Sequence, residues 1–269
     1  MNAWSNPDTL APQDAMNMAL FLHARAQTPD QQRVQAALVA ALDPQLGTHV
    51  LDLGCGTGAI TERLASCVGS TGLAVGIDWS QTMLEVARAH HTHTALRFEQ
   101  GDGTDLAYPD GHFDCAVAAR LLMHVPDPHA VLRELRRVVR VDGRLALLER
   151  DWGTFAVDHN DRELTRRILD WRCDHIDGNN WAGRQLPRLC AETGWHVYDI
   201  QPIVAVARDE HTTLLGSLRH SAQLAAANAV ISATEHDTWI GEIEQRLEER
   251  SFFATINEYI VIADHTEHS

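Results

Sequence analysis

Residues 51–58 read LDLGCGTG and decide the fold. A buried apolar run containing Asp52 leads into Gly54, Gly56 and Gly58, and the helical pattern AITERLASCV follows at once. Glycines at a spacing of two let the backbone turn tightly and let a ligand approach the peptide groups closely. The following helix start offers unpaired N–H groups. The stretch therefore predicts a strand, a ligand-binding turn and a helix.

Short apolar runs alternate with helical segments around this loop. THVLDLG, GLAVGID, LRFEQGD, FDCAVAA and GRLALLE are typical of buried strands, and AITERLASCV, SQTMLEVARAH and DPHAVLRELRRVVR lie between them. Strict alternation implies right-handed crossovers and a parallel sheet with helices on both faces. WHVYDIQPIVAVA and SFFATINEYIVIAD predict a sixth and a seventh strand. We expect an α/β fold with a seven-stranded, mostly parallel sheet.

The segment after Asp127 shows the helical pattern most clearly. One stripe is apolar and comprises Leu132, Leu135, Val138 and Val139. The opposite face carries Arg133, Arg136, Arg137 and Arg140. We expect a helix that ends at Val141-Asp142-Gly143, with glycine just past its C-terminus. The arginine face is interpreted as a solvated outer face rather than a phosphate site, because cations near a helix C-terminus are favourable in any case.

The chain is long enough for one large domain. We interpret residues 1–269 as a single domain with a helical N-terminal cap at 1–45 and a ligand-binding core at 46–150. The stretches at 151–183 and 209–250 interrupt the strand pattern and are too long for structureless loops. We expect them to be helical insertions that form a lid.

Composition excludes several classes of function. All 22 basic side chains are Arg, so Schiff-base or P-loop lysine chemistry is ruled out. The net charge of −15 argues against nonspecific binding to nucleic acid or anionic membranes. No run approaches the ~18 apolar residues of a membrane span. Five cysteines without a CxxC pair, and an N-terminus unlike a signal peptide, favour a cytoplasmic protein without disulfides.

Carboxylates stand where several predicted strands end or begin. Asp52 precedes the glycines, Asp78 ends the second strand, Asp102 ends the third and Asp114 opens the fourth in FDCAVAA. We expect all four at the carboxyl edge of one sheet. There Asp78 can accept hydrogen bonds from both hydroxyls of a ribose, and Asp102 can accept one from an adenine amine. Because Asp52 suits a cationic group better than a pyrophosphate, the set indicates a nucleoside with a positive charge.

Four stretches in register resemble the class I S-adenosylmethionine-dependent methyltransferases. They are VLDLGCGTG, GIDWSQTMLEVAR, GDGTDLAYPDGHFDCAVAARLLMHVPDP and VDGRLALLERDW. The chain is most similar to the small-molecule branch of ubiquinone/menaquinone-biosynthesis and natural-product enzymes. The resemblance covers residues 47–152 and continues more weakly over GRQLPRLCAETGW. It implies a Rossmann-like fold, S-adenosylmethionine as cofactor, S-adenosylhomocysteine as product and a small-molecule substrate.

The resemblance also implies which residues hold the cofactor. Asp52, Gly54 and Gly56 would line its methionine part, with Arg120 contacting the same end through the backbone. Asp78 would bind the ribose.

The adenine contacts implied by the resemblance come from the next two strand ends. Trp79 and Met83 would lie against the ring, and Asp102, between Gly101 and Gly103, would accept its amine. The backbone N–H of Gly103 would support the ring. Two alternatives stay open, namely that Trp79 only caps a helix and that Met83 is a core residue.

Methyl transfer is an in-line displacement, so the protein must align the reactants, exclude water and, for some acceptors, take one proton. His124 in LLMHVPDP faces the transferred methyl in the family and is the first candidate for a base, with Asp151 as the second. Arg150 and Trp152 lie beside Asp151 after the fifth strand and should enter the substrate pocket. A His124 that only holds its loop is the alternative.

The remaining histidines offer weaker candidates. His175 is a candidate substrate contact in the predicted lid, with His211 and His220 as further possibilities. The HHTH stretch at residues 90–93 is a poor metal site, because adjacent side chains point in different directions and no acidic partners accompany them. We expect no functional metal.

Four functions follow from these observations. The first is methyl transfer from S-adenosylmethionine to an O, N or C atom of a small, aromatic or heterocyclic metabolite by a monomer or homodimer. The second keeps the cofactor but shapes a cyclisation, and the third methylates RNA or protein. The fourth is an NAD oxidoreductase, since Gly54, Gly56 and Ala59 satisfy a GxGxxA pattern, but Asp52 argues against it.

Overall fold

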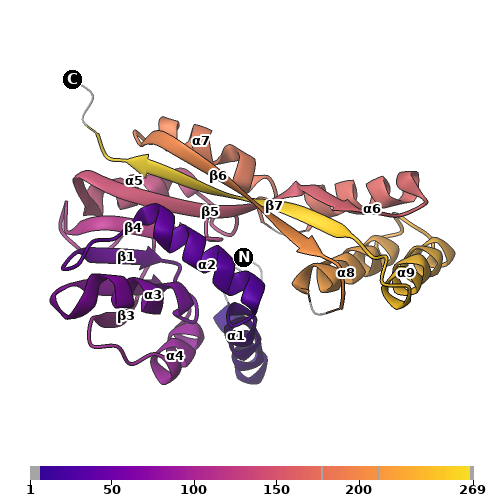
Figure 1. Ribbon diagram of the computed structural model, residues 1–269, viewed down its shortest axis with the longest axis horizontal. Helices are drawn as coiled ribbons and strands as arrows, with labels where there is room; N and C mark the ends of the chain where they lie inside the picture. The colour runs from indigo at the N-terminus through magenta and orange to yellow at the C-terminus, as the bar shows by residue number, and fades with distance from the viewer. Residues whose placement is uncertain (1–6, 177, 211, 267–269) are drawn as a thin grey trace. The chain divides into compact units, whose positions relative to one another are not determined.

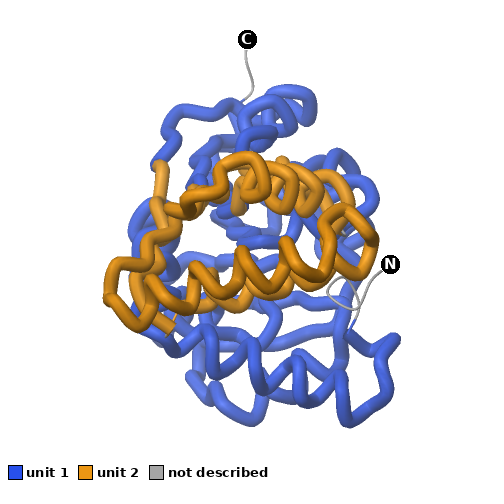
Figure 2. The backbone as a smooth tube through the Cα atoms, turned by 90° about the vertical axis from the view of Figure 1, so that its right-hand side faces the viewer, with its two compact units in different colours: residues 1–149, 184–201, 259–269 blue, residues 150–183, 202–258 orange. Residues whose placement is uncertain are grey.

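The computed structural model describes residues 7–176, 178–210 and 212–266. The chain forms two compact units, shown separately coloured in Figure 2. Unit 1 comprises residues 1–149, 184–201 and 259–269, and unit 2 comprises residues 150–183 and 202–258. No helix in the described part of the chain is long and apolar enough to cross a membrane.

One seven-stranded sheet organises the chain, in the order β3-β2-β1-β4-β5-β7-β6 (Figure 1). Its strands are β1 (His49–Leu53), β2 (Leu73–Asp78), β3 (Leu96–Gln100), β4 (Phe113–Ala119), β5 (Val139–Val157), β6 (His196–Ala207) and β7 (Ala254–Asp264). The first five pair in parallel. The backbone bonds Asp142 N to His265 O and His265 N to Gly143 O attach β7 to β5. The expected Rossmann-like sheet is confirmed.

Alternating side chains in unit 1 serve the two faces of the sheet. Leu51 and Leu53 of β1 belong to the core that includes residues of α5 (Pro128–Val138) and α7 (Ala182–Glu192). Asp52, between them, points to the other face, where it bonds to Thr61 of α3 (Ala59–Val68). This period of two places the glycine loop at the end of β1 with a carboxylate under it.

The N-terminal region of unit 1 is helical, as the sequence predicts. It holds η1 (Pro7–Thr9), α1 (Pro12–Ala26) and α2 (Pro29–Leu42); further on come η2 (Gly69–Thr71) and α4 (Gln81–His90). Two groups cap α4: Ser80 Oγ accepts from Met83 N at 3.2 Å, and Asp8 accepts from Ser80 Oγ and Gln81 N, both at 2.8 Å. Residue Asp8 thereby ties the N-terminal segment to the helix that follows β2.

Unit 2 contains three helices that pack together: α6 (Arg162–His175), α8 (Thr213–Ala227) and α9 (Ala233–Glu248). Trp239 of α9 is fully buried and donates from Nε1 to Thr165 Oγ1 at 3.0 Å. His159 stacks on its ring. A capping box of Ser232 and Glu235 begins α9. Unit 2 therefore has a small core of its own, and its helices lie in the two regions predicted to be insertions.

Two predicted boundaries are wrong. The helix α5 ends at Val138, and β5 begins at the next residue, so Val141-Asp142-Gly143 lies inside the strand rather than at a helix end. The strand β5 also continues to Val157, so Asp151 and Trp152 lie within it instead of following it. An apolar strand stops being recognisable where polar residues enter it, and pairing with a neighbouring strand extends it beyond that point.

Candidate cofactor and acceptor sites

The loop after β1 has the backbone that its glycines predict. Gly54, Gly56 and Gly58 all have positive φ, at +73°, +52° and +84°. A Cβ on Gly58 would lie 2.5 Å from Phe98 Cζ, whereas a Cβ on Gly56 would meet nothing within 4 Å. Gly58 is therefore needed for packing. Gly56 borders open space that a ligand can approach.

Asp52 is a buried carboxyl directly under this loop. It is 1% exposed, and its Oδ2 accepts from Thr61 Oγ1 at 2.6 Å. Burial raises the pKa of Asp52 to about 7, the Thr61 hydroxyl opposes the rise, and the nearby charge of Asp78 adds to it. A positively charged ligand beside this carboxyl would stabilise its ionised form.

Asp78 braces the same loop from the end of β2. Its Oδ2 accepts from Gly56 N at 2.7 Å, and its Oδ1 accepts from Ser80 N at 2.9 Å. Burial raises the pKa of Asp78, although both backbone N–H groups favour the ionised form. Each carboxylate oxygen can accept more than one bond, so these contacts leave room for the predicted ribose hydroxyls.

The two predicted adenine contacts beside Asp78 differ in exposure. Trp79 is 47% exposed, and its carbonyl accepts from Gln100 Nε2 at 2.9 Å. Met83 is buried in a cluster with Ala19 and Val86. Trp79 is therefore exposed enough to contact a ligand. Met83 is packed as a core residue, which is the alternative given for it above. An adenine contact for either residue remains a prediction.

The loop after β3 holds the third predicted carboxylate. Asp102 is exposed, and its Oδ1 accepts from both Thr104 N and Thr104 Oγ1 at 2.8 Å. This turn fixes the carboxyl group and leaves Oδ2 without a partner among the described residues. Gly101 N donates to Asp78 O at 3.1 Å, and a Cβ on Gly103 would lie 3.3 Å from Leu53. The loop therefore packs onto the ends of β1 and β2.

Asp114 does not belong to this set, and that expectation is wrong. It is the second residue of β4, at the edge where the parallel strands begin. It accepts from His49 N at 2.8 Å and from Arg140 Nε at 2.9 Å. An acid that opens a parallel strand lies at the opposite edge from acids that end one, so its role is to join β1, β4 and β5.

The loop after β4 meets the glycine loop. Arg120 has a φ of +55°, which is strained for a non-glycine residue, and its N donates to Leu148 O at 2.7 Å. The next residue, Leu121, is so close that a Cβ on Gly54 would lie 2.9 Å from its Cδ1. The strained turn thus places the β4 loop against the predicted methionine end of the cofactor.

His124 lies further along this loop. Its N donates to Leu121 O at 2.8 Å, and its buried Nδ1 has no hydrogen-bond partner among the described residues. Burial lowers the pKa of His124, which keeps the imidazole neutral near pH 7 and able to accept a proton.

Glu149 is a residue that the sequence analysis missed. It is fully buried at the point where unit 1 gives way to unit 2, and its Oε1 accepts from Leu122 N at 2.6 Å and Met123 N at 3.4 Å. A carboxylate held by backbone N–H groups is a strong local anchor. In the sequence, Glu149 could have been noticed as an acidic residue that directly follows four apolar residues of β5. Glu149 positions the loop that carries His124.

The predicted substrate residues of β5 lie in unit 2. Arg150 is 5% exposed and forms a buried ion pair with Glu258 of β7. Asp151 is 1% exposed, and its Oδ1 accepts from Gly153 N at 3.0 Å. Trp152 is 8% exposed and packs against Phe155. All three side chains are buried, and their contact with a substrate remains a prediction.

The helix α6 adds a residue that the sequence analysis missed, because Arg172 lies across the Trp152 ring. By contrast, His175 is exposed, stacks on Trp171 and bonds to the Trp171 carbonyl. His220 is exposed on α8, and His211 lies outside the described residues. Within the described part of the chain, neither His175 nor His220 contacts Trp152 or Arg172.

The histidines at 90–93 have structural partners. His91 bonds to Glu62 at 2.7 Å and to the Thr57 carbonyl at 3.0 Å, and His23 of α1 packs on His90. Within the described ranges, no group of three or more His, Cys, Asp and Glu is arranged to hold a metal. These rings therefore connect α1, α3 and α4.

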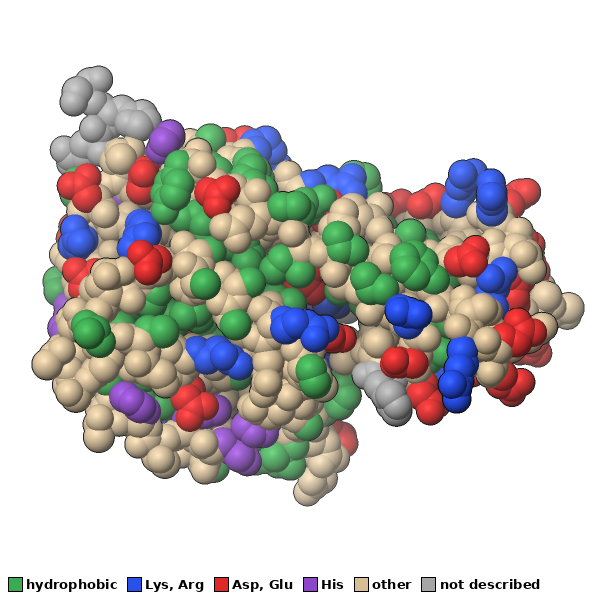
Figure 3. All heavy atoms as spheres, viewed as in Figure 1, with side chains coloured by type: hydrophobic (Ala, Val, Ile, Leu, Met, Phe, Trp, Pro, Cys, Tyr) green, Lys and Arg blue, Asp and Glu red, His purple; other side chains and the backbone are tan. Residues whose placement is uncertain are grey.

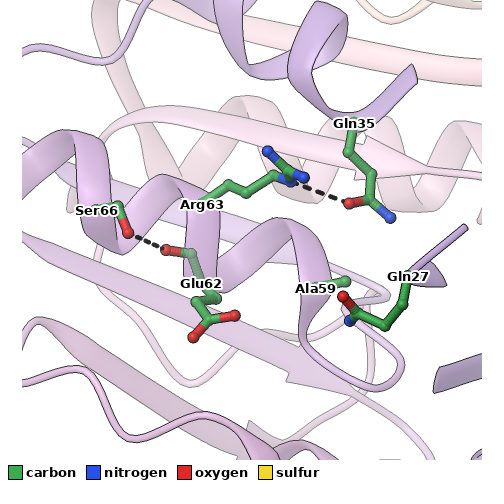
Figure 4. A pocket seen from close by; sticks show the side chains of 6 residues that line it. All are labelled: Gln27, Gln35, Ala59, Glu62, Arg63 and Ser66. Atoms are coloured by element: carbon green, nitrogen blue, oxygen red, sulfur yellow. Dashed lines mark hydrogen bonds between the residues drawn. The ribbon is translucent and has the colours of Figure 1, made fainter. Parts of the chain in front are cut away.

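A small surface pocket lies elsewhere in unit 1 (Figure 4). It measures about 160 Å³ and is lined by Gln27, Gln35, Ala59, Glu62, Arg63 and Ser66. Arg63 Nε donates to Gln35 Oε1 at 3.0 Å, so its main polar groups satisfy one another. It contains none of the predicted site residues and is not a candidate site.

Comparison with known proteins connects this geometry to a family. Residues 51–147 match the family model "Methyltransferase domain". Over 249 residues the chain is 36% identical to the uncharacterized 37.1 kDa protein in transposon TN4556 of Streptomyces fradiae, a match that covers 91% of this chain and 71% of that protein.

A second relative matches a shorter part. The 2-phytyl-1,4-naphtoquinone methyltransferase of Synechococcus elongatus is 45% identical over 107 residues, or 38% of this chain, and the match spans about half (46%) of that enzyme. Among solved structures, a Bacillus halodurans protein assigned as a methyltransferase superposes with a TM-score of 0.61 at 18% identity, covering 87% of this chain and 99% of that one. This last likeness establishes the fold.

The site fits the cofactor of that family. A buried carboxyl lies two residues before the glycine loop, an open glycine lies within the loop, and carboxylates end β2 and follow β3. These are groups for an ammonium, a ribose and an adenine amine. With the family match and the extended relative, they show that the chain belongs to the S-adenosylmethionine-dependent methyltransferases.

Proposed function

We propose that the protein transfers the methyl group of S-adenosylmethionine to an oxygen, nitrogen or carbon atom of a small aromatic or heterocyclic molecule. The observation that carries the proposal is the contact between Gly54 and Leu121. This contact supports the proposal because it joins the loop of the candidate base His124 to the loop proposed to hold the cofactor. The named quinone methyltransferase among the relatives supports a small acceptor.

The chain's own residues have separable tasks in this reaction. Asp52, Gly54 and Gly56 would hold the methionine part of the cofactor, Asp78 the ribose and Asp102 the adenine. When bound, the cofactor supplies an activated methyl group with a neutral leaving group. The protein aligns the acceptor with that methyl group and excludes water.

His124 is proposed as the group that takes a proton from a hydroxyl acceptor. Its neutral imidazole has an unpartnered buried nitrogen, and Glu149 fixes the neighbouring backbone. Asp151 is the second candidate. Its Oδ1 already accepts from Gly153 N, so His124 ranks first.

The test combines binding with product analysis. Calorimetry should show binding of S-adenosylhomocysteine, and S-adenosylmethionine with a deuterated methyl group should label a member of a small-molecule panel. For a phenol acceptor, His124→Asn should lower kcat about 100-fold and leave cofactor affinity unchanged, whereas the exposed control His196→Asn should change neither. No cofactor binding would refute the proposal, and an unlabelled rearranged product would indicate a cyclase instead.

A further inference from the structure

The Arg172 side chain on α6 is a buried guanidinium without a carboxylate partner among the described residues. It is 7% exposed, and its one recorded hydrogen bond runs from Nη1 to Asn180 Oδ1 at 3.3 Å. Among the residues that the structure describes, its buried Nε has no hydrogen-bond partner. A buried charge is ordinarily paired because its desolvation is costly.

The groups around Arg172 do not balance its charge. Its Cζ lies 3.2 Å from the centre of the Trp152 ring, which offers a partial, directional attraction only. The nearby Arg150 is itself positive and is held by Glu258. Burial, and next the charge of Arg150, lower the pKa of Arg172 to about 9, so the group still carries its proton at pH 7.

Surface arginines of unit 2, unlike Arg172, are paired with acidic side chains. Arg167 pairs with Glu235, and Arg219 pairs with Glu244, each at 2.7 Å. Figure 3 shows arginine and acidic side chains interspersed over this unit. Arg172 alone among these three is buried and has no acid in reach within the described chain.

The geometry points to Arg172 as a binding site in unit 2 for the carboxylate of a small organic molecule. The bond to Asn180 uses Nη1, so the edge formed by Nε and Nη2 is the part of the guanidinium that no recorded bond occupies. Two parallel N–H groups at this edge match the two oxygens of a carboxylate. The inferred ligand is therefore an organic acid, and this inference concerns unit 2 alone.

Benzoate and its neutral isostere benzamide are the probes, used with the full chain at constant ionic strength. Melting temperature and tryptophan fluorescence report binding without any turnover. Benzoate should bind and stabilise the wild-type protein and benzamide should not. Arg172→Gln should weaken benzoate at least tenfold, and Arg166→Gln, at an exposed position on the same helix, should leave it unchanged.

Asn180→Asp gives a second variant that keeps the arginine. An internal carboxylate beside Nη1 supplies the missing charge, so benzoate should again weaken about tenfold while the ligand-free protein melts higher. Equal binding of benzoate and benzamide by the wild type would overturn the inference, as would full benzoate affinity in either variant. Calorimetry with S-adenosylhomocysteine separates the two proposals: its failure would refute the methyltransferase activity, and its success with no benzoate binding would refute the Arg172 site alone.

Discussion

The affinity for the cofactor should rise steeply with pH because of Asp52. This carboxyl is 1% exposed, and its pKa is raised to about 7, chiefly by burial. The protonated carboxyl offers no charge to the cofactor's ammonium group. The ionised carboxyl offers a full charge in a poorly solvated site. Cofactor binding should therefore be coupled to the loss of one proton from Asp52.

The size of the effect follows from the pKa of Asp52. The ionised fraction is about 0.03 at pH 5.5 and about 0.8 at pH 7.5, so affinity should rise about 20-fold between them. Titration calorimetry of S-adenosylhomocysteine at these two values, in buffers of different ionisation enthalpy, measures both the affinity and the proton released. Most of the cofactor's own amino group stays charged across this range.

Asp52→Asn is the matched control, because an amide resembles the protonated carboxyl. At pH 7.5 it should bind more than 20-fold more weakly than the wild type, and because its own affinity is nearly unchanged with pH, this gap should shrink about 20-fold at pH 5.5. The raised pKa also means that the ionised form costs the folded state about 4 kcal/mol, fully felt above pH 7 and relieved as pH falls towards 4. The variant should therefore melt no lower than the wild type at pH 7.5. A wild-type affinity that is flat across the range would refute the reasoning.

Three further changes test other parts of the structure. Gly58→Ala should lower the free energy of unfolding, measured with urea, by about 2–4 kcal/mol, because φ is +84° and the new Cβ would lie 2.5 Å from an aromatic carbon. Gly56→Ala, at an open position, should instead weaken the binding of S-adenosylhomocysteine measured by calorimetry. Glu149→Gln should speed hydrogen exchange in residues 120–124 and lower kcat at unchanged cofactor affinity; protected amides there would contradict the anchoring role. Arg172→Met should raise the melting temperature of the ligand-free protein by about 2–6 °C. The pKa of Arg172, lowered to about 9, corresponds to a cost of about 5 kcal/mol for the buried charge, and loss of the contact with Trp152 offsets about 2 kcal/mol of that gain. A lower melting temperature would contradict the unpaired charge.

The loop proposed to hold the cofactor, with its positive-φ glycines, could be predicted because it is built from local sequence. Parallel strands end at one edge, so Asp52 and Asp78 meet once the strand order is given. The same reasoning failed for Asp114. This residue opens β4 instead of ending it, so it lies at the opposite edge of the parallel sheet. Met83 shows the remaining ambiguity, since burial on a helix and contact with a ligand leave the same apolar signature in sequence.

The side-chain contacts of unit 2 could not be predicted from the sequence, because they join distant segments. Arg150 finds Glu258 across 108 residues, and Arg172 meets Trp152 from another element. A local signal for Arg172 does exist: Thr165, Ile168 and Arg172 share the buried side of α6, so a charge sits where the helical period calls for an apolar residue.

This division also limits what the relatives can say about the acceptor. The methyltransferase family model ends at residue 147, just before unit 2 begins at residue 150. The naphtoquinone enzyme matches 38% of the chain, whereas the Streptomyces fradiae protein matches 91%, a span too long to leave unit 2 out. A shared cofactor loop explains the first match without any shared acceptor. Because the Arg172 cluster lies wholly in unit 2, a ligand proposed for that cluster should be carried over from a relative only where the relative's sequence also matches unit 2.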